Sequence, residues 1–112
     1  MQTVIVSDPH VATYAQAIHA GEGEMVTVGP EDVDFPGWVW CTNTAGISSW
    51  VPKSYLEVNG ESGRLMRDYH AGELTVAVGE RLKVLDEESG WYLCETEANQ
   101  RGWVPIENVR PL

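Results

Sequence analysis

The sequence repeats one pattern of residues at a fixed offset, and this repeat constrains the fold more than any local signal does. Gly37-Trp38-Val39-Trp40-Cys41 is followed by Trp50-Val51-Pro52, and Gly90-Trp91-Tyr92-Leu93-Cys94 is followed by Trp103-Val104-Pro105. The two sets lie 53 residues apart, and in each the Trp-Val-Pro segment begins nine residues after the cysteine. A period of this size corresponds to one small domain. The 112 residues therefore predict two copies of one fold.

The local pattern of each copy favours short strands. Apolar and polar residues alternate with a period of two over 25–28, 74–78 and 81–85. Clusters of Gly, Pro, Asn and Asp separate these stretches, and helix signals are scarce. Short strands with turn signals every 8–12 residues or so are typical of a small antiparallel barrel or sandwich. We therefore predict an all-β fold with two small antiparallel β-barrels in tandem.

The repeat and the turn signals together suggest domain boundaries. Copy one spans residues 3–58 and copy two spans residues 64–112. Residues 59–63 are polar and turn-rich, so they are interpreted as a linker. A unit of roughly 55 residues buries only about 60% of its chain surface, and we therefore expect the two barrels to pack against each other.

Charge and hydropathy limit the possible partners. The chain carries 7 basic and 17 acidic residues, a formal net charge of −10. Such a field repels nucleic acid and anionic lipid and attracts a basic protein or peptide. No apolar run approaches the roughly 20 residues that span a membrane, and the first residues lack the basic and apolar regions of a signal peptide. We expect a cytoplasmic protein that binds neither nucleic acid nor membrane.

Residue types that support catalysis or metal binding do not form recognisable motifs. Cys41 and Cys94 occupy equivalent positions of the repeat, which predicts two buried, unpaired thiols and a reducing compartment. His10, His19 and His70 are scattered without metal-ligand spacing. No nucleophile–base or acid–base constellation is apparent. The expectation is therefore a non-enzymatic protein without a metal or other cofactor.

Copy two resembles an SH3 domain along nearly its whole length. Five segments match the motifs of this family in the right order: the opening ALYDY motif, the following ELSF strand, the Gly-Asp turn, the Trp-Trp strand and the closing segment. They are Leu65-Met66-Arg67-Asp68-Tyr69, Glu73-Leu74-Thr75-Val76, Gly79-Glu80, Ser89-Gly90-Trp91-Tyr92, and Gly102-Trp103-Val104-Pro105-Ile106-Glu107-Asn108-Val109.

Copy one matches the same family less completely. Gly23-Glu24 aligns with the Gly-Asp turn, Gly37-Trp38 with the Trp strand, and the segment from Trp50 to Leu56 with the closing segment. Its opening, Val6-Ser7-Asp8-Pro9-His10, has no tyrosine. The whole chain resembles the tandem variant SH3 proteins found in bacteria.

The resemblance implies a peptide-binding groove in each copy. SH3 domains present a row of aromatic side chains between two polar loops, and extended peptides, often in polyproline II form, lie across that row. In copy two the matching residues are Tyr69, Trp91 and Pro105, whereas Arg67 and Asn108 stand where two further tyrosines belong. The groove of copy two is therefore expected to keep about half of its aromatic row.

The groove of copy one is also expected to be partial. Its matching residues are Trp38, Pro52 and Tyr55. Asp8 and His10 replace the two tyrosines of the opening motif, and Tyr14 in the same loop is a candidate to fill part of the gap.

Acidic residues precede the groove tryptophan in both copies. A tryptophan face beside carboxylates suits a cation, through cation–π attraction and ion pairing. We therefore predict a non-enzymatic interaction module that binds a basic, proline-containing segment of a protein partner. The acidic residues are Glu31, Asp32 and Asp34 before Trp38, and Asp86, Glu87 and Glu88 before Trp91.

Two other functions fit the same residues. In the first, the barrels bury their own grooves against each other or in a homo-oligomer, and the chain is a structural or scaffold protein. Near-complete burial of Trp38 and Trp91 would favour that alternative. In the second, the chain is a cell-wall-binding bacterial SH3 domain. The sequence leaves the partner, the oligomeric state and the number of working grooves open.

Overall fold

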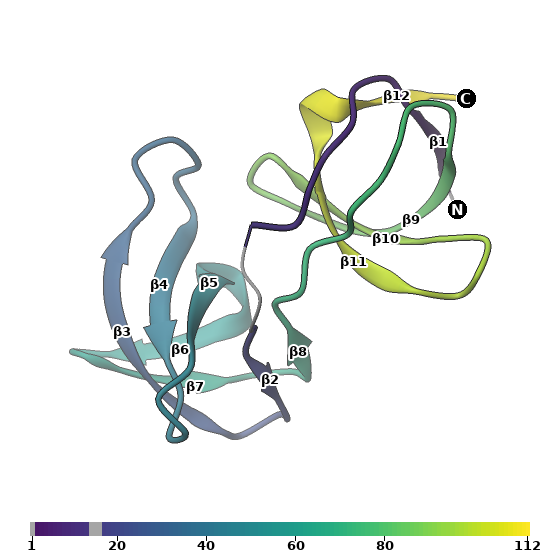
Figure 1. Cartoon of the computed structure of the whole chain (residues 1–112). Helices are drawn as coiled ribbons and strands as arrows, with labels where there is room; N and C mark the ends of the chain where they lie inside the picture. Colours follow the sequence, from purple (N-terminus) through teal and green to yellow (C-terminus); the bar gives the residue numbers. More distant parts are fainter. Residues whose placement is uncertain (1, 14–16) are drawn as a thin grey trace. The chain divides into compact units, whose positions relative to one another are not determined.

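The chain forms antiparallel strands and almost no helix, as Figure 1 shows for the computed structural model. The structure describes residues 2–13 and 17–112. Two 3-10 turns, η1 (Lys53–Tyr55) and η2 (Ile106–Asn108), are the helical elements of the described residues. None of the described helical elements is long and apolar enough to cross a membrane. The all-β class predicted from the sequence is confirmed.

The chain divides into two compact units, and each is described by itself. Unit 1 consists of Met1–Ala15 and Gly72–Leu112, and unit 2 consists of Gln16–Ala71. The strands of unit 1 are β1 (Thr3–Val6), β9 (Arg81–Glu88), β10 (Trp91–Glu95), β11 (Arg101–Pro105) and β12 (Val109–Pro111). The strands of unit 2 are β2 (His19–Ala20), β3 (Met25–Glu31), β4 (Trp38–Thr42), β5 (Ser48–Pro52), β6 (Leu56–Asn59), β7 (Ser62–Leu65) and β8 (Tyr69–His70).

Each unit contains a five-stranded sheet with a corresponding strand order. The order is β11-β10-β9-β1-β12 in unit 1 and β5-β4-β3-β7-β6 in unit 2. In both sheets three consecutive strands form a meander, β9–β11 in unit 1 and β3–β5 in unit 2. The first strand of each meander, β9 or β3, pairs with a strand that comes from the other copy of the sequence repeat. Unit 2 also contains the short β2–β8 ladder.

Strand β1 completes the core of unit 1. Its residues alternate between exposed and buried, so Val4 and Val6 point inward. They pack in one cluster with residues of the second copy, including Leu82, Cys94 and Val104. The pairing is antiparallel on both sides, with Val4 opposite Leu82 of β9 and opposite Pro111 of β12. The first strand of the sequence therefore belongs to the sheet of the second copy.

Strand β7 has the reciprocal role in unit 2. Leu65 lies opposite Leu56 of β6, and Arg64 lies opposite Met25 of β3. Asn59 pairs with Ser62, so residues 59–63 form the turn and the start of a hairpin rather than a free linker. Gly60 has a φ of 62° at the first central position of this two-residue turn, a geometry that suits the twist of a hairpin.

The two units therefore differ from the domains predicted from the sequence. The prediction placed residues 3–58 in one domain and residues 64–112 in the other. In the structure the opening strand of each copy pairs in the sheet of the other copy. The physical reason is the tight turn at Gly60, which folds β7 back on β6 and fills the place beside β3.

The exchanged strands can be tested by substitution in their buried side chains. Val6→Ala removes two buried methyl groups and should lower the free energy of unfolding by about 2 kcal/mol. Its backbone NMR shifts should change in β9 and β12 of unit 1, because Val6 packs there. Leu65→Ala is the matched variant: it should cost about 3 kcal/mol and shift β3 and β6 instead. Shift changes from Val6→Ala centred on residues 25–59 would contradict the strand assignment.

Candidate functional site

The register of the strands places the same pair of residues at the same position in each unit. Trp38 of β4 lies directly opposite Pro52 of β5, and Trp91 of β10 lies directly opposite Pro105 of β11. Residues directly opposite each other on an antiparallel pair have side chains on the same face. The tryptophan–proline pairs expected from the repeat are thus present in the geometry of both sheets.

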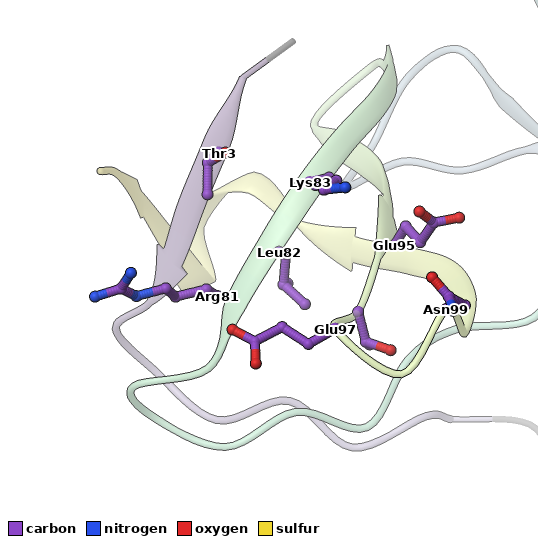
Figure 2. Close-up of a pocket in the computed structure, with 8 residues that line it drawn as sticks. Thr3, Arg81, Leu82, Lys83, Glu95, Glu97 and Asn99 are labelled. Carbon is purple, nitrogen blue, oxygen red and sulfur yellow. The ribbon is translucent and has the colours of Figure 1, made fainter.

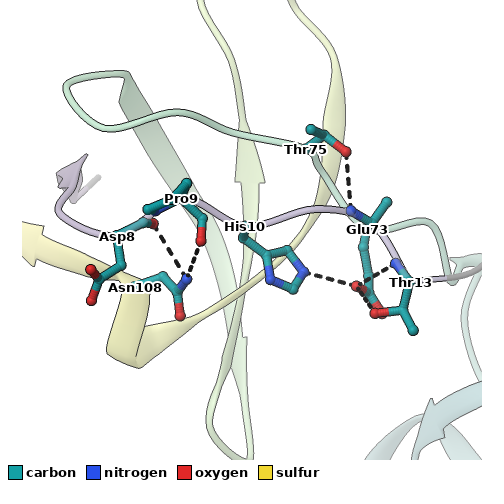
Figure 3. Close-up of polar contacts among 8 residues, drawn as sticks. Asp8, Pro9, His10, Thr13, Glu73, Thr75 and Asn108 are labelled. Atoms are coloured by element: carbon teal, nitrogen blue, oxygen red, sulfur yellow. Dashed lines mark hydrogen bonds and ion pairs between the residues drawn. The ribbon is translucent and has the colours of Figure 1, made fainter.

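In unit 1 the segment that follows β1 places His10 beside Trp91. The His10 ring meets the edge of Trp91 with ring centroids 5.6 Å apart and an interplanar angle of 80°. The Nε2 atom of His10 lies 2.9 Å from Oε1 of Glu73, within hydrogen-bond distance. Thr13 donates two further hydrogen bonds to the same carboxylate oxygen, from its backbone N–H and its hydroxyl (Figure 3). Glu73 therefore fixes the segment that carries His10.

Asn108 holds the other end of the same segment. Its Nδ2 atom donates hydrogen bonds to the backbone carbonyl oxygens of Asp8 and Pro9, at 3.3 and 3.0 Å (Figure 3). The backbone N–H groups of Ser7 and Asp8 donate to the Asn108 carbonyl. Asn108 stands where the resemblance predicted a lost groove tyrosine, and in the structure its side chain positions backbone next to His10.

Unit 2 contains a different cluster, built from two tyrosines and an arginine. The rings of Tyr55 and Tyr69 meet edge to face with centroids 5.3 Å apart. The Arg67 guanidinium carbon lies 4.3 Å from the centroid of the Tyr55 ring, a cation–π distance. The Tyr69 hydroxyl donates a hydrogen bond of 2.7 Å to the Trp50 carbonyl. A cation from the chain itself therefore covers the tyrosine face.

The structure regroups the predicted site residues. Tyr69 was grouped with Trp91 and Pro105, but it lies in unit 2 beside Tyr55. His10 was grouped with Trp38, but it lies in unit 1 beside Trp91. Both changes follow from the exchange of β1 and β7. The segment that follows each of these strands lies in the same unit as the strand. Tyr14 lies outside the described residues.

The two predicted groove tryptophans differ in burial. Trp38 is 4% exposed, and Tyr55 and Tyr69 of the same unit are 3% and 4% exposed. Pro52 and Pro105 are buried as well, whereas Trp91 is half-buried. Of these two tryptophans, Trp91 therefore presents more of its surface to solvent.

Carboxylates lie near both tryptophans, in part on strands rather than in loops. Asp86, Glu87 and Glu88 belong to β9, and Glu88 lies directly opposite Trp91. Glu31 belongs to β3, accepts a 3.1 Å hydrogen bond from Lys53 and a second one from the Gly37 backbone N–H. These two donors lower the pKa of Glu31, the Lys53 bond first.

Two of the remaining acidic residues before the tryptophans bond to local backbone. Asp32 accepts a hydrogen bond from the backbone N–H of Asp34, at 3.0 Å. Asp86 accepts one from the backbone N–H of Glu87, at 2.8 Å. Such side-chain bonds to nearby N–H groups shape turns and strand ends.

Two features near these clusters were not predicted. Trp40 and Trp50, directly opposite each other on β4 and β5, form an edge-to-face pair with centroids 4.9 Å apart, and both are half-buried. The contact of Arg67 with Tyr55 also follows only from the strand exchange. The turn residues between Trp40 and Trp50 in the sequence signal the first feature, because opposite positions of a hairpin place side chains on one face.

A pocket of about 320 Å³ lies elsewhere in unit 1, as Figure 2 shows. Its lining mixes the cations Arg81 and Lys83 with the carboxylates of Glu95 and Glu97. None of the predicted site residues lines it. Among the described residues, no group of three or more His, Cys, Asp or Glu side chains is placed to hold a metal ion.

Comparison with known families assigns part of this chain. Residues 62–112 match the variant SH3 domain family. A variant SH3 domain therefore lies in this part of the chain, and SH3 domains are protein-interaction modules. The matched segment begins with β7, which pairs in unit 2, and continues through β9 to β12 in unit 1.

Two mammalian proteins are similar to part of the chain. One is the epidermal growth factor receptor kinase substrate 8-like protein 3 of Mus musculus, 46% identical over 43 residues, which cover 38% of this chain. The other is the protein of the same name from Homo sapiens, 45% identical over 40 residues, which cover 36% of this chain. The matched part spans 7% of the length of each relative. No solved structure matches the chain significantly.

The buried cysteines give a prediction about chemical labelling. Cys41 and Cys94 are unpaired and fully buried, and burial raises their thiol pKa from 9.0 to about 11 and about 12. At pH 8 both thiols should therefore react very slowly with iodoacetamide in the folded chain and readily in denaturant, as followed by mass spectrometry. Burial of the two neutral thiols stabilises the fold fully below pH 9, the pKa of the unfolded chain's thiols. This stabilisation should be lost as the pH rises from there through the thiol pKa values of the folded state. Rapid labelling of either thiol in the folded chain would contradict the buried positions.

The contacts of Glu73 give a prediction about the stability of unit 1. Glu73→Ala removes the acceptor of three hydrogen bonds from His10 and Thr13 and should lower the free energy of unfolding by about 2 kcal/mol. Glu73→Gln keeps an acceptor oxygen and should cost less. Urea unfolding measures both, with Glu97→Ala at an exposed position as the control. Equal stability of the wild type and Glu73→Ala would show that these contacts do not hold the segment.

Proposed function

We propose that the chain is a non-enzymatic interaction module of two SH3-like barrels, and that unit 1 binds a basic, proline-containing segment of a partner protein. The observation that carries this proposal is the half-buried Trp91, which lies opposite Pro105 and meets the edge of His10. The corresponding strand orders of the two sheets support the assignment of one barrel to each unit.

The chemistry around Trp91 favours a cationic ligand. Glu88 lies directly opposite Trp91 on the neighbouring strand. An arginine or lysine over the tryptophan face gains cation–π attraction and an ion pair with such a carboxylate. The exposed part of the indole provides a flat apolar surface, which suits a rigid polyproline II ridge. The net charge of −10 attracts a basic partner over a longer range.

A structural role is the second candidate, and the burial in unit 2 favours it there. Trp38, Tyr55 and Tyr69 are each less than 5% exposed. Arg67 already stacks on the Tyr55 ring, and Lys53 already bonds to Glu31. Contacts within the chain thus occupy both the aromatic face and an acidic residue that a basic ligand would use. Under this candidate unit 2 supports the fold, and unit 1 carries the binding site.

The location and origin of the chain remain parts of the proposal. Two unpaired thiols suit a reducing compartment, in agreement with a cytoplasmic protein. A bacterial source and a cell-wall ligand are expected only from the resemblance and stay predictions. Detection of the chain outside the cytoplasm would favour the cell-wall ligand.

The binding proposal is tested by NMR titration with a synthetic peptide that contains two arginines beside a Pro-x-x-Pro segment. The amide signals of Trp91, His10 and Glu88 and the indole signal of Trp91 should shift, and the shifts should level off as the peptide saturates the site. Trp91→Ala should weaken binding at least about tenfold, since truncation of an aromatic hot-spot residue typically costs about 2 kcal/mol or more. A peptide with both arginines replaced by glutamate is the control and should cause no shifts.

Two outcomes would separate the candidates. Trp38→Phe keeps the apolar core of unit 2 and should leave peptide affinity unchanged, because Trp38 is buried. If Trp38→Phe weakens binding and Trp91→Ala does not, the site lies in unit 2 and the assignment to unit 1 is wrong. The absence of any shift at millimolar peptide would favour the structural role for both units.

A further inference from the structure

Two histidines that are far apart in the sequence face each other in unit 2. His19 of β2 and His70 of β8 are directly opposite in the antiparallel ladder. Their ring centroids lie 5.0 Å apart, with an interplanar angle of 79°. The hydrogen bond from the Ala71 N–H to the Ile18 carbonyl, 2.8 Å long, fixes the register beside the pair. Both residues are exposed, so a solute reaches the two rings.

The separation of the rings fits one metal ion held between them. A metal–nitrogen bond of about 2.0 Å places the centre of an imidazole ring roughly 3.2 Å from the ion. At a tetrahedral angle, two such rings have centres about 5.2 Å apart. The observed 5.0 Å is close to that value. The strand pairing therefore already holds the two ring centres at the separation that a shared ion requires.

We propose that His19 and His70 form a two-imidazole site for a divalent transition-metal ion, with Cu²⁺ bound more tightly than Zn²⁺. Imidazole nitrogen is a ligand for copper, nickel and zinc rather than for calcium or magnesium, and affinities generally peak at Cu²⁺. No group of three or more potential ligands is found among the described residues, so water would complete the coordination. The sequence alone predicted no metal site, because the two histidines lie 51 positions apart and meet only through the β2–β8 pairing.

The two histidines belong to unit 2 and the Trp91 cluster belongs to unit 1, so this proposal does not depend on peptide binding.

The test is titration of the isotope-labelled chain with CuCl₂ at pH 7.5, followed by NMR. One Cu²⁺ per chain should broaden signals around residues 18–20 and 69–71 first. Calorimetry with ZnCl₂ on the same chain should give one binding event, and CaCl₂ should give none. Bound Zn²⁺ should also raise the melting temperature, because it joins two strands of the folded state.

Single substitutions decide whether the pair is responsible. His19→Gln and His70→Gln should each weaken Cu²⁺ and Zn²⁺ binding at least about tenfold, since each removes one of two ligands. Both positions are exposed, and a dispersed NMR spectrum checks that each variant folds. His10→Gln changes the third histidine of the chain and should leave metal affinity unchanged. Unchanged affinity in either His19→Gln or His70→Gln, or broadening centred elsewhere, would overturn the proposal.

Discussion

The pairing of β1 with β9 and β12 determines how this chain is assembled. It places Val4 and Val6 in the core of unit 1, although both belong to the first copy of the sequence repeat. The place of the first strand in unit 2 is taken by β7, which the tight turn at Gly60 folds back on β6. A unit this small has little stability to lose. If one of its five strands were missing, the free-energy cost of the exposed sheet edge and of the lost core contacts would be larger than that stability. The two strand placements therefore depend on each other.

The strand exchange also decides which side chains meet in each candidate groove. The segments that follow β1 and β7 lie in the same units as these strands, so His10 contacts Trp91 and Tyr69 contacts Tyr55. As a result Trp38, Tyr55 and Tyr69 all belong to unit 2, where they are buried. Unit 1 keeps one reachable tryptophan with polar neighbours. The two copies thus share a strand order but differ in the surface that they present.

Part of this structure follows from the sequence alone. Alternation and turn residues predict an all-β chain, and the repeat predicts that tryptophan and proline occupy equivalent positions in the two copies, because these signals are local. Which copy contributes the first strand to each sheet is a different question. Residues 3–6 and 62–65 both turn every second residue toward a core, so this local pattern alone does not assign either strand to a sheet. The Asn59-Gly60 dipeptide carried the deciding signal, and it was interpreted as part of a linker although it also favours a hairpin turn.

The same limit applies to contacts between residues that are distant in the sequence. His19 and His70 show no metal-ligand spacing, and Arg67 shows no relation to Tyr55 until the strands are paired. Local patterns specify which face a residue occupies, whereas strand pairing specifies its neighbours. In a repeated sequence, two pairings can satisfy the same local patterns. The chemistry of each candidate site in this protein therefore depends on long-range pairing, and a site inferred copy by copy combines residues that the fold separates.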